Sequence, residues 1–297
     1  MQTPQPLTAN HHNRLGRSDD IEAPSHSGPF LLADLPHRDS LTAILISLGR
    51  FFVGLSFIVF GIQHFWVSGF IGDLGLVPHW APAQVAWAWL AGAALLLAGA
   101  SILAGRYARF ATFVLGFVFL ITGLLRFTAR IPGMLHSFGN RGVFCEFLAF
   151  CGGSWMLSCV FPADLRIPSL SLSRALAGIG FWIFALATIV LGYGHFQLPG
   201  LIASLIPGWL PFRLFLAWFT GCALVAAGLA MALRIQTRLA ATLLGAMYFS
   251  WVLIVHAPRI AHALHDVDEW NSGYVCLAMA GFAFIVAAFA SRTRARD

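Results

Sequence analysis

The feature that most limits how this chain can fold is a series of eight apolar stretches, each long enough to cross a bilayer as a helix. Such a helix needs about 20 apolar residues, and the stretches lie at 44–66, 84–105, 110–128, 143–161, 176–196, 212–233, 239–257 and 273–291. Only 10% of the residues are charged and the mean hydropathy is +0.79, whereas an ordinary globular domain carries about 25% charged residues. The sequence therefore predicts an all-α polytopic membrane protein of eight transmembrane helices.

Residues 1–40 differ in kind from the rest of the chain. They contain Gln, Pro, Ser, His and Asp with few large apolar residues, and a segment of this composition cannot bury enough apolar surface to fold alone. The order of basic, apolar and small residues that marks a cleaved signal peptide is not seen there. We predict a disordered tail at 1–40, followed by a first apolar stretch that is retained as a helix.

The basic residues indicate how the helices are oriented. All 18 basic residues are arginines, and on an eight-span path Arg126, Arg130, Arg141, Arg213 and Arg259 fall on one side while the others fall on the opposite side. Cytoplasmic loops carry the excess of basic residues. The pattern predicts a multi-pass protein with both termini in the cytoplasm. The arginines form no interleaved basic and aromatic patch, so no nucleic-acid partner is expected.

The two halves of the chain repeat one another, and this decides the expected domain organisation. The following pairs match across four helices: Gly49 and Gly180, Gly61 and Gly192, His64 and His195, Trp80 and Trp209, Gly92 and Gly221, Gly99 and Gly228, Arg109 and Arg238, Arg130 and Arg259, Cys145 and Cys276. Internal repeats of this kind indicate duplication. We predict two four-helix units, at 41–165 and 166–292. Because each unit has an even number of spans, the two enter the membrane from the same side and form parallel repeats.

Ionisable and aromatic side chains gather near the predicted outer ends of the helices. The candidate ligand-binding residues are His64, His195, His256, Arg130, Arg259, Glu146, Trp80 and Trp209. Glu146 is the only acidic residue inside a predicted span, where an ionisable group is expensive, and its counterpart in the second half is Leu277. Trp80 and Trp209 lie in two Pro-x-Trp-x-Pro loops, which also suit the aromatic belt of a membrane protein.

A purely structural role is also consistent with these residues. An interfacial histidine can simply hydrogen-bond a loop carbonyl or a helix end, and an arginine near a helix end can reach the headgroups. The five cysteines form no Cys-x-x-Cys pair, so no thiol redox centre is expected. The segment from His256 to Glu269 is rich in His, Asp and Glu but lacks a recognised metal-binding spacing. We predict no metal site.

The sequence LGRFFVGLSFIVFGIQHF, with Arg50, Gly54, Gly61 and its aromatic end, resembles the first helix of DoxX-like bacterial membrane proteins. The resemblance continues through the Pro-x-Trp-x-Pro loop, the glycine-rich second helix and the Arg-Ala start of the third, and it covers nearly all of 44–291. The family is typically a single four-helix bundle of the bacterial inner membrane, so the resemblance implies two tandem copies in that membrane. Some members are membrane subunits of quinone-linked oxidoreductases.

Three kinds of function are consistent with this sequence. The first is a DoxX-like protein that binds a quinone-like or lipid molecule, or supports a membrane redox partner, near its outer face; quinone is the one cofactor expected, and catalysis by this chain alone is not. The second is a transporter or channel for a small solute, with a path between the two units. The third is a structural or assembly protein whose polar residues only hold helices together. The sequence does not choose among them, and it names neither substrate nor partner.

Overall fold

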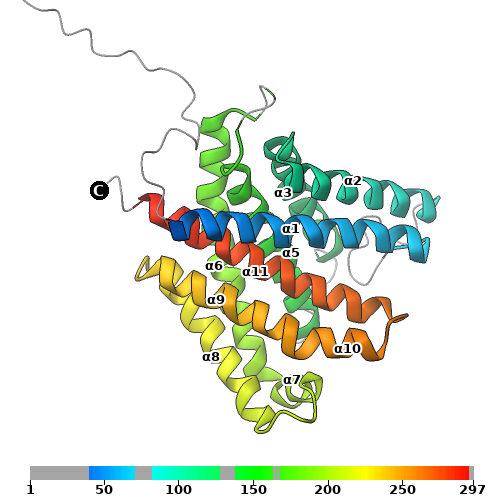
Figure 1. The fold of residues 1–297 in the computed structure, drawn as a ribbon, viewed down its shortest axis with the longest axis vertical. Helices are drawn as coiled ribbons and strands as arrows, with labels where there is room; N and C mark the ends of the chain where they lie inside the picture. The colour runs from blue at the N-terminus through cyan, green and yellow to red at the C-terminus, as the bar shows by residue number, and fades with distance from the viewer. Residues whose placement is uncertain (1–39, 71–81, 128–137, 163–164, 166–167, 294–297) are drawn as a thin grey trace, which may run out of the picture. The chain divides into compact units, whose positions relative to one another are not determined.

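The structure, a computed structural model, describes residues 40–70, 82–127, 138–162, 165 and 168–293, and this part of the chain is almost entirely helical (Figure 1). All of these helices belong to one compact unit. The helices are α1 (Ser40–Val67), α2 (Gln84–Ala104), α3 (Ala108–Phe127), α5 (Phe138–Ser158), α6 (Leu170–Gln197), α7 (Pro199–Leu205), α8 (Arg213–Ala232), α9 (Thr237–Trp251), the π-helical turn η3 (Val252–His256), α10 (Ala257–His262) and α11 (Val267–Thr293). The predicted tail at 1–40 lies outside the described residues apart from Ser40.

Seven of the described helical segments are long and apolar enough to cross a membrane. They are α1, α2, α3, α6, α8, the continuous segment from α9 to α10, and α11, and each overlaps a predicted stretch. The chain is therefore a multi-pass helical membrane protein. The predicted fourth stretch is helical too, as α5, but α5 is not among the seven because its sequence includes Arg141, Glu146 and several Gly and Ser residues.

The two halves of the chain exchange contacts. In each half the first helix packs on the second and the third packs on the fourth: α1 on α2 and α3 on α5, α6 on α8 and α9 on α11. The first helix of each half also packs along the fourth helix of the other, so that α1 lies beside α11 and α6 beside α5 (Figure 1). Contacts between α5 and α11 join the two sets. Extensive contacts, those of α5 with α6 above all, thus run across the predicted boundary between 165 and 166.

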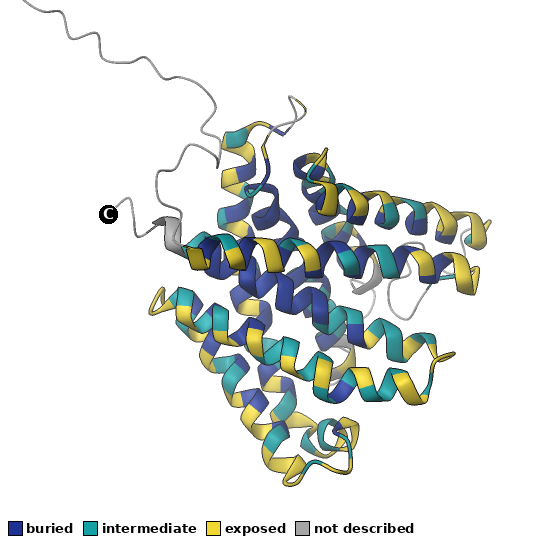
Figure 2. Ribbon diagram, in the orientation of Figure 1, coloured by how far each residue is buried: buried dark blue, intermediate teal, exposed yellow. Residues whose placement is uncertain are grey.

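The hydrophobic core lies where α1, α5, α6 and α11 meet. Side chains of α5 and α11 such as Cys151, Met156, Phe282 and Val286 are fully buried, and dark blue ribbon concentrates along α11 in Figure 2. Of the membrane-span window of α11, 72% is buried inside the protein, against 22% for the segment from α9 to α10. A helix that is surrounded by other helices need not be as apolar as one that faces lipid, which explains how α5 can carry polar residues.

Paired glycines let the helix backbones approach closely. A Cβ on Gly180 of α6 would lie 2.5 Å from the carbonyl oxygen of Gly152 of α5, and a Cβ on Gly49 of α1 would lie 2.8 Å from that of Gly281 of α11. In lipid, close backbone approach at small residues drives helix association, since lipid tails are as apolar as the side chains they would replace. The glycines therefore fix both crossings between the halves.

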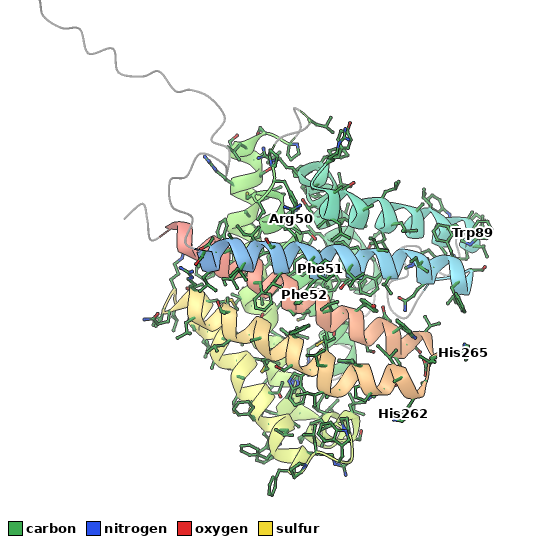
Figure 3. The ribbon with its side chains drawn as sticks, viewed as in Figure 1. Arg50, Phe51, Phe52, Trp89, His262 and His265 are labelled. Carbon is green, nitrogen blue, oxygen red and sulfur yellow. The ribbon has the colours of Figure 1, made fainter. Side chains whose placement is uncertain are left out.

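Side chains on opposite sides of α1 tie it to different neighbours, as Figure 3 shows for Arg50 and Phe52. Arg50 donates to the carbonyl oxygen of Ile102 on α2 at 3.3 Å and lies 4.8 Å from the ring centroid of Phe161. Phe52 stacks on Phe249 of α9 with 4.9 Å between ring centroids. The same helix thus contacts its own half through Arg50 and the other half through Phe52.

The outward faces of the helices are strongly apolar. Leu97 of α2 is 70% exposed and Phe212, just before α8, is 79% exposed, and similar side chains lie along every outer helix. A soluble protein rarely exposes apolar patches of this extent. The surface is that of a protein whose solvent is the bilayer.

Candidate ligand-binding site

A cavity of about 380 Å³ with several polar lining residues lies among the described helices, and we call it the Arg259 cavity. It lies among α5, α6, α7, α8, α9, η3, α10 and α11, in the part of the bundle built mainly from the second half of the chain. Its lining residues are Glu146, Leu191, His195, Ile202, Leu205, Ile206, Thr220, Leu224, Tyr248, Trp251, Val255, His256, Arg259, Asn271, Ser272, Val275, Cys276 and Met279. Its volume falls within the usual range of small-molecule pockets, about 300–1,000 Å³.

Four of the predicted site residues meet in this cavity: Glu146, His195, His256 and Arg259. They come from α5, from α6 and from the consecutive elements η3 and α10, three places that are far apart in sequence. Glu146 belongs to the first half of the chain and reaches the cavity because α5 packs against α6 and α11. The exchange of contacts between the halves is therefore what completes the cavity.

A π-helical turn presents His256 to the cavity. The third helix of the second half changes from α-helix to π-helix over Val252–His256, while the corresponding end of α3, up to Phe127, is ordinary α-helix. A π turn accommodates an extra residue and re-aims those that follow, and such turns are frequent at functional sites. The two halves thus differ in backbone as well as in sequence at this point.

Arg259 is held by two partners at the edge of the cavity. Its guanidinium donates two hydrogen bonds to the carboxylate of Glu269, at 2.7 and 2.5 Å, and a third to the carbonyl oxygen of Leu205 at 3.3 Å. A bidentate arginine-carboxylate pair fixes geometry as well as charge. The pair connects α10 to α11, and the bond to Leu205 ties the end of α7 to the same point.

Four buried polar atoms of the cavity lining have no hydrogen-bond partner among the described residues. They are Thr220 Oγ1, Trp251 Nε1, His256 Nδ1 and Asn271 Oδ1. A buried polar group without a partner costs about 1–3 kcal/mol, so native proteins rarely leave several together. Their concentration in one cavity indicates a place where a polar molecule supplies the missing partners.

His64 lies in a different cavity. This cavity, which we call the His64 cavity, has a volume of about 260 Å³ and lies among α1, α2, α3 and α5. His64 is fully buried and its Nδ1 is 2.7 Å from the carbonyl oxygen of Phe60, one helical turn earlier. His195 makes the matching contact with Leu191, at 3.1 Å. Each histidine thus bonds its own helix, and neither of these contacts is to a loop.

Three predicted site residues remain, namely Trp209, Arg130 and Trp80. Trp209 is 67% exposed and does not line the Arg259 cavity. Arg130 and Trp80 lie outside the described residues. Trp89, His262 and His265 all lie toward one end of the bundle in Figure 3, which is the end that the sequence predicts to face outward.

Sequence reasoning missed Thr220, Tyr248, Trp251 and Asn271. A signal was present, because the aligned positions of the first half are Ala91, Phe119 and Thr122 for the first three. Each change places a larger or more polar side chain in the second half, and all of these side chains line the Arg259 cavity. Comparing the halves for differences, and not only for identities, finds these three, whereas Asn271 matches Asn140 and gives no such signal.

The class of this protein is defined by its fold and its cavities, because the comparisons with known proteins identify no relative. No model of a known protein family, no curated protein and no solved structure matches the chain. Among the described residues, no group of three or more His, Cys, Asp or Glu side chains is placed to hold a metal ion. What the structure defines is a multi-pass helical membrane protein whose described helices line the Arg259 cavity and a less polar cavity at His64.

Proposed function

We propose that the protein binds a small amphipathic molecule with a neutral, quinone-like head in the Arg259 cavity. The observation that carries this proposal is the pair of buried hydrogen-bond donors without partners among the described residues, on Thr220 and Trp251. The indole N–H of Trp251 can only donate, and the hydroxyl of Thr220 can donate. Carbonyl oxygens of a ligand head would satisfy both.

The charges of the cavity favour a neutral ligand head. The positive charge of Arg259 already has its counterpart in Glu269, and Glu146 adds a carboxyl group to the lining. An anionic lipid head would have to compete with Glu269 for the guanidinium and would lie near a second carboxyl group. A neutral carbonyl group meets neither obstacle.

The walls of the cavity suit the apolar remainder of such a molecule. Leu191, Ile202, Ile206, Leu224 and Met279 line it together with the polar groups. Ligand pockets are typically apolar with a few polar groups that fix orientation. A ring with carbonyl oxygens and an apolar tail has this distribution of chemistry.

The proposal includes the membrane arrangement that the sequence predicts. Eight spans, with α5 as the fourth, would form two parallel DoxX-like repeats in the bacterial inner membrane with both termini in the cytoplasm. The equivalent contacts of α1 with α2 and α11, and of α6 with α8 and α5, support duplication. The distribution of arginines supports the orientation.

Removing the donors tests the proposal. We expect Trp251→Phe and Thr220→Val each to weaken binding of decylubiquinone about five- to tenfold, because each deletes one hydrogen bond to the head. Binding is measured on the purified protein in lipid nanodiscs. Matched controls are Trp218→Phe, on the outer face of α8, and Thr242→Val, on α9 outside the cavity lining. Equal affinity in all five proteins would refute the assignment of the site.

A further inference from the structure

We infer that the His64 cavity is a second, independent binding site and that it takes a long-chain alcohol, whose hydroxyl donates a hydrogen bond to Nε2 of His64. The argument uses the shape of the cavity, the chemistry of its lining and the hydrogen bonding of His64. None of these involves the Arg259 cavity, so this inference stands apart from the proposed function.

The lining of the His64 cavity extends along two neighbouring helices. On α2 it runs from Ala91 to Ser101, and on the other side it runs from Tyr107, just before α3, to Phe119 of α3. At 1.5 Å of rise per residue, the stretch along α2 is about 15 Å long. A volume of about 260 Å³ along that length suits a single extended chain.

The lining is apolar along its length and polar only near its ends. His64 lies beside the α2 end that includes Ala91, because a Cβ on the neighbouring Gly92 would lie 2.9 Å from the Cβ of His64. Ser101 and Tyr107 lie at the other end, and between them the walls are formed by side chains such as Leu95, Ala98 and Leu115. None of the lining residues carries a full charge at neutral pH if His64 is neutral.

The hydrogen bond of His64 decides what the ligand must offer. The carbonyl oxygen of Phe60 can only accept, so the hydrogen of the ring must lie on Nδ1. Nε2 is buried without a partner in the part of the chain that the structure describes, and a charged ring with an unpaired N–H in an apolar cavity would be very costly. The ring is therefore neutral, and Nε2 presents a lone pair that requires a donor.

This requirement selects one ligand class. A quinone or an ester offers only acceptors, which cannot bond to the lone pair of Nε2. A fatty acid anion or a phosphate headgroup would enter an apolar cavity whose lining includes no arginine. A hydroxyl group on an apolar chain satisfies Nε2 and buries the rest of the molecule against apolar walls.

The cavity can be entered from the bilayer. Leu97, Phe110 and Val114 line it and are also exposed on the outer surface of the protein, by 70%, 41% and 37% respectively. That surface faces lipid in a protein of this class. A long-chain alcohol dissolved in the membrane would therefore reach the cavity between α2 and α3 without crossing water.

Photolabelling tests the inference directly on the intact protein in nanodiscs. The probes are 1-hexadecanol that carries a diazirine on its chain, and the methyl ether of the same molecule, which lacks the hydroxyl donor. We expect the alcohol to label peptides from residues 91–119 about five- to tenfold more than the ether, because only the alcohol can bond to Nε2. Equal labelling by the two probes would overturn the inference.

Two substitutions complete the design. His64→Leu is expected to lower labelling by the alcohol to the level of the ether, since it removes Nε2. His195→Leu is the matched control, as it changes the equivalent residue in the other cavity and should leave labelling of 91–119 unchanged. If His64→Leu labels as strongly as the parent, the hydroxyl does not bind there. If that variant does not fold, the comparison of alcohol and ether on the parent still decides the question.

Discussion

Replacing Gly180 with alanine is expected to lower the thermal stability of the protein by several degrees, whereas replacing Gly178 is expected to leave it unchanged or raise it. A Cβ at position 180 would meet the backbone of Gly152, with 2.5 Å to its carbonyl oxygen. Backbone atoms cannot rotate out of the way as a side chain can, so α5 and α6 must move apart. Overpacking of this kind costs about 1–3 kcal/mol.

Gly178 is the control on the same helix. A Cβ there would meet no heavy atom within 4 Å, and alanine is favoured over glycine within a helix by about 0.5–1 kcal/mol. The two substitutions therefore have opposite expected signs, which a general effect of added bulk cannot produce. Thermal unfolding of the purified variants in detergent measures both. Equal midpoints for Gly180→Ala and Gly178→Ala would show that α5 and α6 do not cross at these glycines.

Replacing Arg259 with methionine is expected to destabilise the protein by about 1–3 kcal/mol. Such a loss lies between the values for exposed and fully buried ion pairs, because the side chains of Arg259 and Glu269 are 30% and 18% exposed. The substitution leaves the carboxylate of Glu269 without its partner and frees the carbonyl oxygen of Leu205. Because α7 is tied to Arg259 through Leu205, binding in the cavity should weaken as well.

A double-mutant cycle separates the ion pair from other effects of the change. Glu269→Gln removes the negative charge, and the double variant Arg259→Met, Glu269→Gln removes both charges. We expect the double variant to be more stable than Arg259→Met alone, because no unpaired carboxylate remains near the cavity. Thermal unfolding of the four proteins provides the cycle. Strictly additive losses would mean that the two side chains do not interact.

The positions of the helices could be predicted from the sequence because they depend on local apolar composition. The predicted stretches overlap the seven segments that can cross a membrane, and the stretch at 143–161 overlaps α5. The helix α5 begins at Phe138, earlier than the predicted stretch, because Asn140 and Arg141 interrupt the apolar sequence at its start. Burial among other helices, which composition does not reveal, explains why α5 can include them.

The exchange of contacts between the halves could not be predicted in the same way. The glycines that mark it, such as Gly49 and Gly180, are visible in the sequence as a matched pair. Small residues show that a helix is approached closely, but they do not identify the helix that approaches. Either the fourth helix of the same half or that of the other half would satisfy the pattern.

The residues of the candidate site, too, could be predicted only in part from the sequence. Glu146, His195, His256 and Arg259 were identified as polar residues near the predicted outer ends, and they line one cavity. His64 shares the pattern Gly-x-x-His-Phe with His195 yet lies in the other cavity, because the two belong to equivalent helices in different halves. The π-helical turn that carries His256 depends on packing and leaves no plain mark in the sequence.

Mass spectrometry of the protein released intact from a mild detergent tests the central claim most directly. The claim is that the Arg259 cavity holds a neutral molecule with a carbonyl-bearing head. The parent protein and Trp218→Phe are expected to carry such a molecule, and the double variant Thr220→Val, Trp251→Phe is expected to lose most of it. A parent protein without any bound carbonyl compound, or a double variant that retains as much of it as the parent, would contradict the account.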